Sequence, residues 1–288
     1  MLRKRVAATL VIQKGIVVQS IGFKKYMPLG RPDIAIEFLD RWGIDEIILL
    51  DISATRAGVG PDYELVKKAS LKSHVPLSVG GGITDVDQIK ELMNCGADKI
   101  VLNQSAINDP DIIKKAAKIF GNQCVVVSID AIKEPGGYRV YDYINKKHLP
   151  SIPSVFAKKC EDFGAGEIFI NSVDRDGSYS GYDIPLIQSI CQNVTIPVIC
   201  SGGARNANDF VRVFSETNTS AATAANFFHF TEHSVQLTKA NIKKYIDIRL
   251  DTHSNYLDNP VDGECRLTKK SDQVLEEMLY MRIEKEII

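Results

Sequence analysis

Short apolar runs rich in Val and Ile recur along the chain and alternate with segments that have helical periodicity. The runs are predicted to be strands and lie at 6–12, 46–51, 76–79, 98–102, 124–130, 167–172, 196–200 and 221–225. Apolar residues recur every three or four positions in the segments predicted to be helices, which are 32–42, 63–72, 85–95, 109–120, 155–163, 184–192 and 207–215. This alternation predicts a parallel sheet, because each crossover between parallel strands needs a helix.

Eight such strands over roughly 250 residues are what a (β/α)8 TIM barrel requires. An open doubly wound sheet is the alternative, but no G-x-G-x-x-G fingerprint follows the first run. The two halves of the chain also resemble each other: IDEIILLD at 44–51 is similar to AGEIFINS at 165–172, and VPLSVGGGI at 75–83 to IPVICSGGA at 196–204. Because neither half alone would close its sheet edges, two half-barrel repeats predict one barrel over residues 1–250.

Residues 251–288 follow the predicted barrel and contain nine acidic and five basic residues. We expect a C-terminal extension that is helical near its end and begins at the N-cap Ser271. An apolar stripe on this helix is expected to pack on the barrel wall or on another subunit, and its members are Val274, Leu275, Met278, Leu279, Met281 and Ile283.

Composition and charge exclude several classes of protein. The 288 residues are 44% apolar and 25% charged, and the formal charge of −1 gives no argument for binding nucleic acid or an anionic membrane. No apolar stretch reaches the ~20 residues that cross a bilayer. The six cysteines form no C-x-x-C pair and have no histidine at metal-ligand spacing. We therefore expect a cytoplasmic protein with reduced cysteines, no metal and no cofactor.

Glycines and small polar residues follow four of the predicted strands, at the end of a barrel where function gathers. They are Gly80, Gly81 and Gly82, then Asn103 with Gln104, then Gly202 with Gly203, then Ala225 with Asn226. Glycine lets backbone N–H groups approach an anion closely. The loops predict two phosphate sites on opposite sides of the mouth, and the alternative is that these glycines only form tight turns.

Carboxylates follow further strands and are candidates for acid–base chemistry. They are Asp51, Asp130, Asp174 and Asp176. Partial burial at the rim of a barrel raises the pKa of a carboxyl group toward neutrality, although a lone Asp at a strand end more often caps a helix or a turn. Asp130 is favoured because it ends an uninterrupted apolar strand, CVVVSID. The segment GGYRVYDYINKK at 136–147 is predicted to form a small hairpin over the mouth.

Several longer motifs carry a resemblance to a known family. They are GIDEIILLD at 43–51, VGGGI at 79–83, ADKIVLN at 97–103, FGNQCVVVSIDA at 120–131, GAGEI at 164–168, DRDGSYSGYD at 174–183, SGGA at 201–204 and FHF at 228–230. From Met1 to about Leu250 the chain resembles the cyclase subunit of imidazole glycerol phosphate synthase, in the HisA/HisF family. The resemblance implies a barrel that forms a heterodimer with a glutaminase subunit, receives its ammonia and acts on a small molecule with two phosphate groups.

The resemblance also implies roles for individual residues. Asp130 takes an acid–base role and Asp176 a supporting one. The residues implied in substrate or phosphate binding are Asp51, Gly81, Gly82, Asn103, Gly177, Gly202, Gly203, Ala225 and Asn226. The residues implied in a gate for ammonia at the opposite end of the barrel are Arg5, Glu46, Lys99 and Glu167. For these four charges the alternative is a salt-bridge plug that only closes the barrel floor.

One departure from the family pattern concerns catalysis directly. The family carries a second catalytic Asp at the end of strand one, and Val11 stands at that position here, while Gln19 replaces a family Lys in the mobile first loop. Loss of one member of an acid–base pair typically costs 10²-fold to 10⁴-fold in rate. We favour a divergent subunit of the kind found with surface-polysaccharide amidation systems. The alternatives are an authentic histidine-biosynthetic cyclase and a non-catalytic scaffold that activates a glutaminase.

Overall fold

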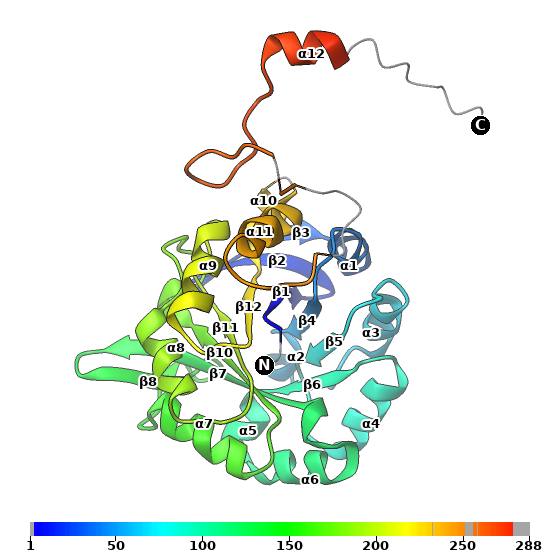
Figure 1. Cartoon of the computed structure of the whole chain (residues 1–288). Helices are drawn as coiled ribbons and strands as arrows, with labels where there is room; N and C mark the ends of the chain where they lie inside the picture. Colours follow the sequence, from blue (N-terminus) through cyan, green and yellow to red (C-terminus); the bar gives the residue numbers. More distant parts are fainter. Residues whose placement is uncertain (1–2, 232, 251–255, 258, 279–288) are drawn as a thin grey trace.

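The computed structural model describes residues 3–231, 233–250, 256, 257 and 259–278. Eight parallel strands close into a barrel, in the ring order β1-β4-β5-β6-β7-β10-β11-β12 with β12 paired to β1. Their bounds are β1 Arg5–Gln13, β4 Glu46–Asp51, β5 Leu77–Gly80, β6 Lys99–Leu102, β7 Val125–Glu134, β10 Glu167–Ser172, β11 Val198–Ser201 and β12 Ala221–Ala224. The predicted TIM barrel is therefore confirmed, and each predicted strand falls on one of these eight (Figure 1).

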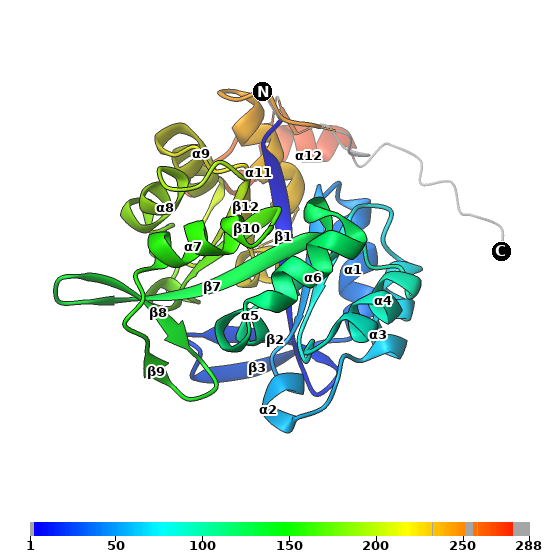
Figure 2. The same ribbon diagram turned by 90° about the horizontal axis from the view of Figure 1, so that it is seen from below.

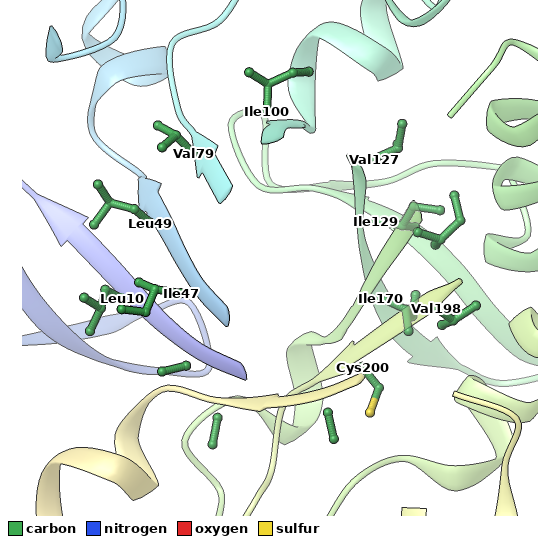
Figure 3. Packing of buried hydrophobic residues seen from close by; sticks show 14 of the residues in the cluster. Leu10, Ile47, Leu49, Val79, Ile100, Val127, Ile129, Ile170, Val198 and Cys200 are labelled. Atoms are coloured by element: carbon green, nitrogen blue, oxygen red, sulfur yellow. The ribbon is translucent and has the colours of Figure 1, made fainter. Parts of the chain in front are cut away.

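Helices surround the barrel on its outside, as Figures 1 and 2 show. Their bounds are α1 Pro32–Arg41, α3 Tyr63–Ser70, α4 Val86–Asn94, α6 Asp111–Phe120, α7 Pro153–Asp162, α8 Ile184–Cys191, α9 Ala207–Glu216 and α11 Ser234–Lys243. Three of them begin at an Asp whose side chain accepts a backbone N–H, namely Asp62, Asp85 and Asp183. The apolar face of each helix packs on outward-facing strand residues such as Leu10, Ile47 and Val127 (Figure 3).

The inward-facing strand residues form layers along the barrel axis, because alternate residues of a strand point to opposite faces. The lowest layer is charged and contains Arg5, Glu46, Lys99 and Glu167, which we call the floor ring. Above it lies an apolar layer made of Ala7, Ile48, Val101, Val126, Phe169, Ile199 and Ala221. The polar residues of the mouth follow at the carboxyl ends of the strands.

Two hairpins extend the mouth beyond the barrel. The segment after β1 is not an open loop but an antiparallel hairpin of β2 (Ile16–Ile21) and β3 (Lys25–Gly30), which lies at the same end as α2 (Ala54–Ala57) in Figure 2. The second hairpin consists of β8 (Gly137–Asp142) and β9 (Lys147–His148), in the segment where the sequence predicts one, and β8 also pairs with the end of the long β7, which continues past the predicted end at residue 130. Short helices start directly after two strands, at α5 (Gln104–Asn108) and α10 (Asn226–Phe230).

The C-terminal extension ends in a further helix, α12 (Asp272–Met278), which projects from the barrel in Figure 1. Ser271 Oγ accepts the Val274 N–H at 3.4 Å, in agreement with the predicted N-cap. Val274 is 40% exposed, whereas the other side chains of the predicted apolar stripe, Leu275, Met278, Leu279, Met281 and Ile283, lie outside the described residues. The packing of that stripe and the boundary at residue 250 stay predictions. In the described ranges no helix has the length and hydropathy to cross a bilayer.

Candidate functional site

A cavity of about 520 Å³ opens at the carboxyl ends of the strands, where the sequence predicts the site. Its wall includes Val11 and Thr9 of β1, the turn after β4, the glycine loop after β5, and the ends of β6, β7 and β10. Both hairpins contribute aromatic side chains to its rim, from Phe23, Tyr26 and Tyr143. The predicted site residues that line this cavity are Asp51, Gly81, Gly82, Asn103, Asp130, Asp176 and Ala225.

Asp130 lies in the wall of this cavity with neutral hydrogen-bond partners. Its Oδ2 accepts from Asn103 Nδ2 at 3.0 Å and its Oδ1 from Asn171 Nδ2 at 3.3 Å. Burial raises the pKa of Asp130 to about 7, against the lowering effect of these two amide donors and with a small contribution from Asp176. A carboxyl group with a pKa near neutrality can act as a proton acceptor or donor at physiological pH.

Asp176 has different partners and holds the first hairpin over the mouth. Its Oδ2 accepts from Ser20 Oγ at 2.6 Å and from the Phe23 N–H at 3.2 Å, while its backbone carbonyl accepts the Gly22 N–H at 3.0 Å. Burial raises the pKa of Asp176, and the hydrogen bonds partly oppose that rise. Asn226 Nδ2 also donates to the Ser20 carbonyl at 2.8 Å. The predicted supporting residue and one predicted phosphate contact thus anchor the hairpin.

Asp51 shapes the turn after β4. Its Oδ1 accepts the Ser53 N–H at 2.8 Å, the Ser53 hydroxyl at 2.6 Å and the Ala54 N–H at 3.2 Å. This is the turn-capping role that the sequence leaves open for an isolated Asp at a strand end. The carboxylate still borders the cavity through its side chain.

The glycines of the mouth permit close contacts between neighbouring loops. A Cβ on Gly81 would lie 2.3 Å from the Asp51 carbonyl oxygen, and one on Gly202 would lie 2.7 Å from the Ser172 carbonyl oxygen. Both glycines have a positive φ, at +119° and +97°. The Gly82 N–H, predicted to meet a phosphate, donates to Thr55 Oγ1 at 3.2 Å. Tight packing alone therefore requires glycine at these positions, whatever ligand the loops hold.

A second, much smaller cavity of about 30 Å³ lies beside the first, over β11 and β12. It is bordered by the predicted phosphate contacts that do not line the first cavity, which are Gly177, Gly202, Gly203 and Asn226. Asp176, Ser201 and Ala225 border both cavities. The predicted contacts therefore gather at two adjoining cavities of different size, and phosphate binding on opposite sides of the mouth stays a prediction.

The floor ring closes the opposite end of the barrel. Glu46 and Glu167, at corresponding places in the two half-barrel repeats, each bridge the same two cations. Arg5 donates to them at 2.5 Å and 2.5 Å, and Lys99 at 3.0 Å and 2.7 Å. Burial lowers the pKa of Arg5, but both carboxylates more than offset this, so the net direction is upward. Ser78 Oγ adds a 2.8 Å hydrogen bond to Glu46. The four predicted gate residues thus form one compensated cluster on the barrel axis.

Comparison with known proteins assigns the chain to a family. A model of the histidine biosynthesis protein family matches residues 5–234. The chain belongs to this family. It is 42% identical over 257 residues to a Vibrio vulnificus (strain YJ016) protein provisionally assigned as imidazole glycerol phosphate synthase subunit hisF2, covering 89% of this chain and 94% of that protein. It is 40% identical over 248 residues to imidazole glycerol phosphate synthase subunit HisF of Clostridium botulinum (strain Okra / Type B1), covering 85% and 97%.

Within this histidine biosynthesis family barrel, Val11 faces the cavity from β1. β1 and β7 are four strands apart in either direction round the ring of eight, so Val11 and Asp130 lie on opposite sides of the mouth. Valine offers no exchangeable proton. Of the carboxylates that line the cavity among the described residues, Asp51 and Asp176 have backbone or hydroxyl partners in the loops, and Asp130 has amide partners only.

Three cavity residues of this family member were not predicted from the sequence. Asn171 pairs in register with Asp130 on the adjacent strand. Tyr143 lines the cavity from the second hairpin, as Thr55 does from α2, so the predicted hairpin does cover part of the mouth. Arg56 contributes a cation to the cavity rim. Asn171 could have been found by its position opposite Asp130 on the next predicted strand, whereas nothing in the sequence indicates the loop contacts of Tyr143 and Arg56.

His229, in the FHF segment, and the six cysteines line neither cavity. Burial lowers the pKa of His229 to about 4, so its imidazole is neutral at pH 7. All six cysteines are free thiols, three of them buried. The described ranges contain no group of three or more His, Cys, Asp and Glu side chains that could hold a metal ion.

Proposed function

We propose that this chain is the synthase-side barrel of a glutamine amidotransferase complex. A glutaminase subunit delivers ammonia at the floor ring, and the barrel uses it on a phosphorylated small molecule bound in the mouth cavity. The observation that carries the proposal is the combination of a complete floor ring with Val11 in place of an acid opposite Asp130. On this proposal the barrel still receives ammonia but does not carry out the ring closure that is typical of the family.

The floor ring supports delivery because its charges are balanced. Two cations and two carboxylates offset the desolvation cost of burying one another. A buried cluster of this kind is expected to be retained either for a function or for a gain in stability. The ring also lies on the axis that leads to the cavity. Relatives at 40–42% identity carry the name of a synthase subunit, which favours an enzyme over a scaffold.

Val11 supports an acceptor other than the histidine-pathway ribonucleotide, and sugar amidation is the role we favour. Ring closure of the family type needs a proton donor and acceptor on opposite sides of the substrate. Here one side of the mouth is aliphatic. Purified protein supplied with ammonium and the histidine-pathway ribonucleotide should give turnover at least about 10²-fold below a relative with both acids. Turnover equal to such a relative would contradict the divergent role.

The alternative of an authentic cyclase, forming imidazole glycerol phosphate, rests on the names of the relatives and on the retained Asp130. The same assay decides between the two. Identification of the neighbouring genes provides an independent check, since histidine genes favour the cyclase and sugar-amidation genes favour the divergent acceptor.

The scaffold alternative is separated by a change in the floor ring. Glu46→Gln leaves Arg5 and Lys99 with one fewer carboxylate, so we expect glutamine hydrolysis in the complex to continue while amination falls. Glu91→Gln, on the exposed face of α4, serves as the matched control. If the chain is only a scaffold, there is no amination for the variant to lose. A glutaminase whose activity does not respond to this chain at all would contradict delivery of ammonia, both for the divergent role and for the authentic cyclase.

A further inference from the structure

Asp130 has two neighbours that hold it in one orientation, and they come from the strands on either side. Asn103 follows β6 and Asn171 belongs to β10, while Asp130 belongs to β7 between them. Asn103 Nδ2 donates both to Asp130 Oδ2 and to the Ser128 carbonyl oxygen, each at 3.0 Å. Because the Ser128 carbonyl oxygen accepts only, and Asp130 Oδ2 accepts when its carboxyl group is ionised, the Asn103 amide presents its NH₂ group to them.

Asn171 contacts the carboxyl group of Asp130 from the neighbouring strand β10. Its register partner on β7 is Asp130 itself, and its Nδ2 lies 3.3 Å from Asp130 Oδ1. Gly202 lies against the amide oxygen of Asn171, where a Cβ on residue 202 would come within 3.2 Å of it. The register of β7 and β10 therefore places the Asn171 side chain next to the carboxyl group, and glycine at position 202 leaves room for its amide oxygen.

The surroundings of Asp130 contain no strong charge partner. The ionisable groups that interact with it are Asp176, Tyr26 and Tyr143, and the described residues place no cation in salt-bridge contact with it. Amide donors favour the charged form weakly, and burial favours the neutral form. These opposing effects leave both protonation states accessible near pH 7.

We propose that Asn171 is a positioning residue which, together with Asn103, keeps Asp130 ready to accept and then release one proton in the same reaction. The proposal rests on the proposed function for its reaction. When the ammonia nitrogen forms its bond to the acceptor carbon, Asp130 takes the proton that nitrogen loses. The same proton passes to the oxygen that leaves the carbon, and Asp130 returns to its starting form. One carboxyl group thus replaces the opposed pair that Val11 makes impossible.

The test is a titration of Asp130 in the full-length protein, followed by carboxyl ¹³C NMR and assigned with Asp130→Asn. We expect a midpoint near neutrality in the wild type. Asn171→Leu removes a donor to the charged form and should raise the midpoint by about one pH unit. Asn108→Leu is the matched control, because Asn108 lines the same cavity without a hydrogen bond to Asp130, and it should leave the midpoint unchanged.

An unchanged midpoint in Asn171→Leu, or an equal shift in Asn108→Leu, would overturn the proposal. If Asn171→Leu does not fold, Asn171→Ala tests the same donor with a smaller side chain. The titration needs neither acceptor nor glutaminase, so a failure of the proposed function leaves its outcome readable. Where ammonia-dependent turnover is found, the basic or acidic limb of its pH profile should move with the NMR midpoint in Asn171→Leu.

Discussion

At the scale of single residues, three carboxylates line one cavity and differ in their hydrogen-bond partners. Asp51 accepts from its own turn, Asp176 from the first hairpin, and Asp130 from two amides. Asp130 alone of the three can gain or lose a proton without weakening a hydrogen bond that holds a loop in place. The division of roles follows from which atoms surround each group, since all three are the same residue type, at the end of β4, within β7 and in the loop after β10.

Restoring an acid on β1 tests the importance of Val11. In Val11→Asp, two carboxylates would face one another across the mouth, and like charge should raise the pKa of Asp130 above about 7. We expect turnover of the histidine-pathway ribonucleotide with ammonium to rise by 10²-fold or more over the wild type. Val11→Asn has a similar volume without the acid and should give no gain. Equal rates for the two variants would show that something else prevents ring closure.

Burial of Asp130 should make stability depend on pH. The pKa of Asp130 is raised in the folded protein, from 3.8 to about 7, so the stability it contributes is present below pH 3.8 and is lost as the pH rises to 7. In Asp130→Asn this pH-dependent loss of stability is absent, because the amide does not ionise. The Tm of the variant minus that of the wild type should therefore increase from pH 4 to pH 8, by at most an amount equal to about 4 kcal/mol.

Asp87→Asn, in the first turn of α4, is a control for changes in surface charge. Its Tm difference should be nearly flat over the same range. A flat difference for Asp130→Asn as well would mean that the carboxyl group titrates at an ordinary pKa in the folded protein.

At the scale of elements, strands and amphipathic helices could be predicted because each buries one face or one stripe. The prediction for β4 is correct to the residue, and α1 begins at the expected Pro32. The helix α11 was not predicted, because its residues from Ser234 to Ile242 are all buried although about half of them are polar, so apolar residues do not mark a buried face. The β2–β3 hairpin was missed for the opposite reason, because β3 is mostly exposed and has no apolar alternation.

The candidate site could likewise be predicted in part only. Residues at strand ends could be located from the sequence, because the end of a barrel strand fixes where its side chain lies. The hydrogen bonds of Ser20 to Asp176 and of Asn226 to Ser20 join segments more than 150 residues apart, and no local pattern encodes such partners.

The first hairpin should loosen when its contact with Asp176 is weakened. Ser20→Ala removes the 2.6 Å bond between the hydroxyl and Asp176 Oδ2. A hydrogen bond to a charged group contributes roughly 1.5–3 kcal/mol, so the Gly22 and Phe23 amides should exchange with solvent on the order of tenfold faster or more. Hydrogen–deuterium exchange by mass spectrometry measures this. Ser178→Ala in the neighbouring loop should leave those amides unaffected, and protection that is unchanged in Ser20→Ala would assign the anchoring to Asn226.

At the scale of the whole molecule, the extension returns to the barrel after α11. Tyr256 contacts His233 at the start of that helix, with 3.0 Å between the hydroxyl and Nδ1, and Glu264 accepts from Asn206 Nδ2 at 3.0 Å. Cys265 is buried in the same region. These contacts lie at the N-terminal ends of α9 and α11, and the family match ends at residue 234. All eight strands of the barrel precede residue 225 and pair with one another in a ring, so no strand of the barrel comes from the extension.

A chain ending at Leu250 should still fold. Loss of the buried Cys265 and of the Tyr256 contact should lower the Tm by a few degrees, corresponding to about 1–2 kcal/mol. Thermal melting and a sizing measurement test this together. Glu264→Gln in the full chain should change the Tm by less than about one degree, because the ion pair of Glu264 with Arg205 is exposed and such pairs contribute little. An unchanged number of subunits and an unchanged Tm after truncation would argue against packing of the extension on the wall and on another subunit alike.

The apolar layer of the barrel interior lies between the floor ring and the mouth cavity and opposes the passage of ions from one to the other. An ion crossing between the floor ring and the cavity would lose its water among Ala7, Ile48, Val101 and Phe169, with no counter-charge to replace it. Neutral ammonia carries no such penalty. Ammonium arriving from a glutaminase would therefore leave its proton on the floor side, and the chemistry at the mouth would have to balance its own protons between Asp130 and the water that enters past the hairpins.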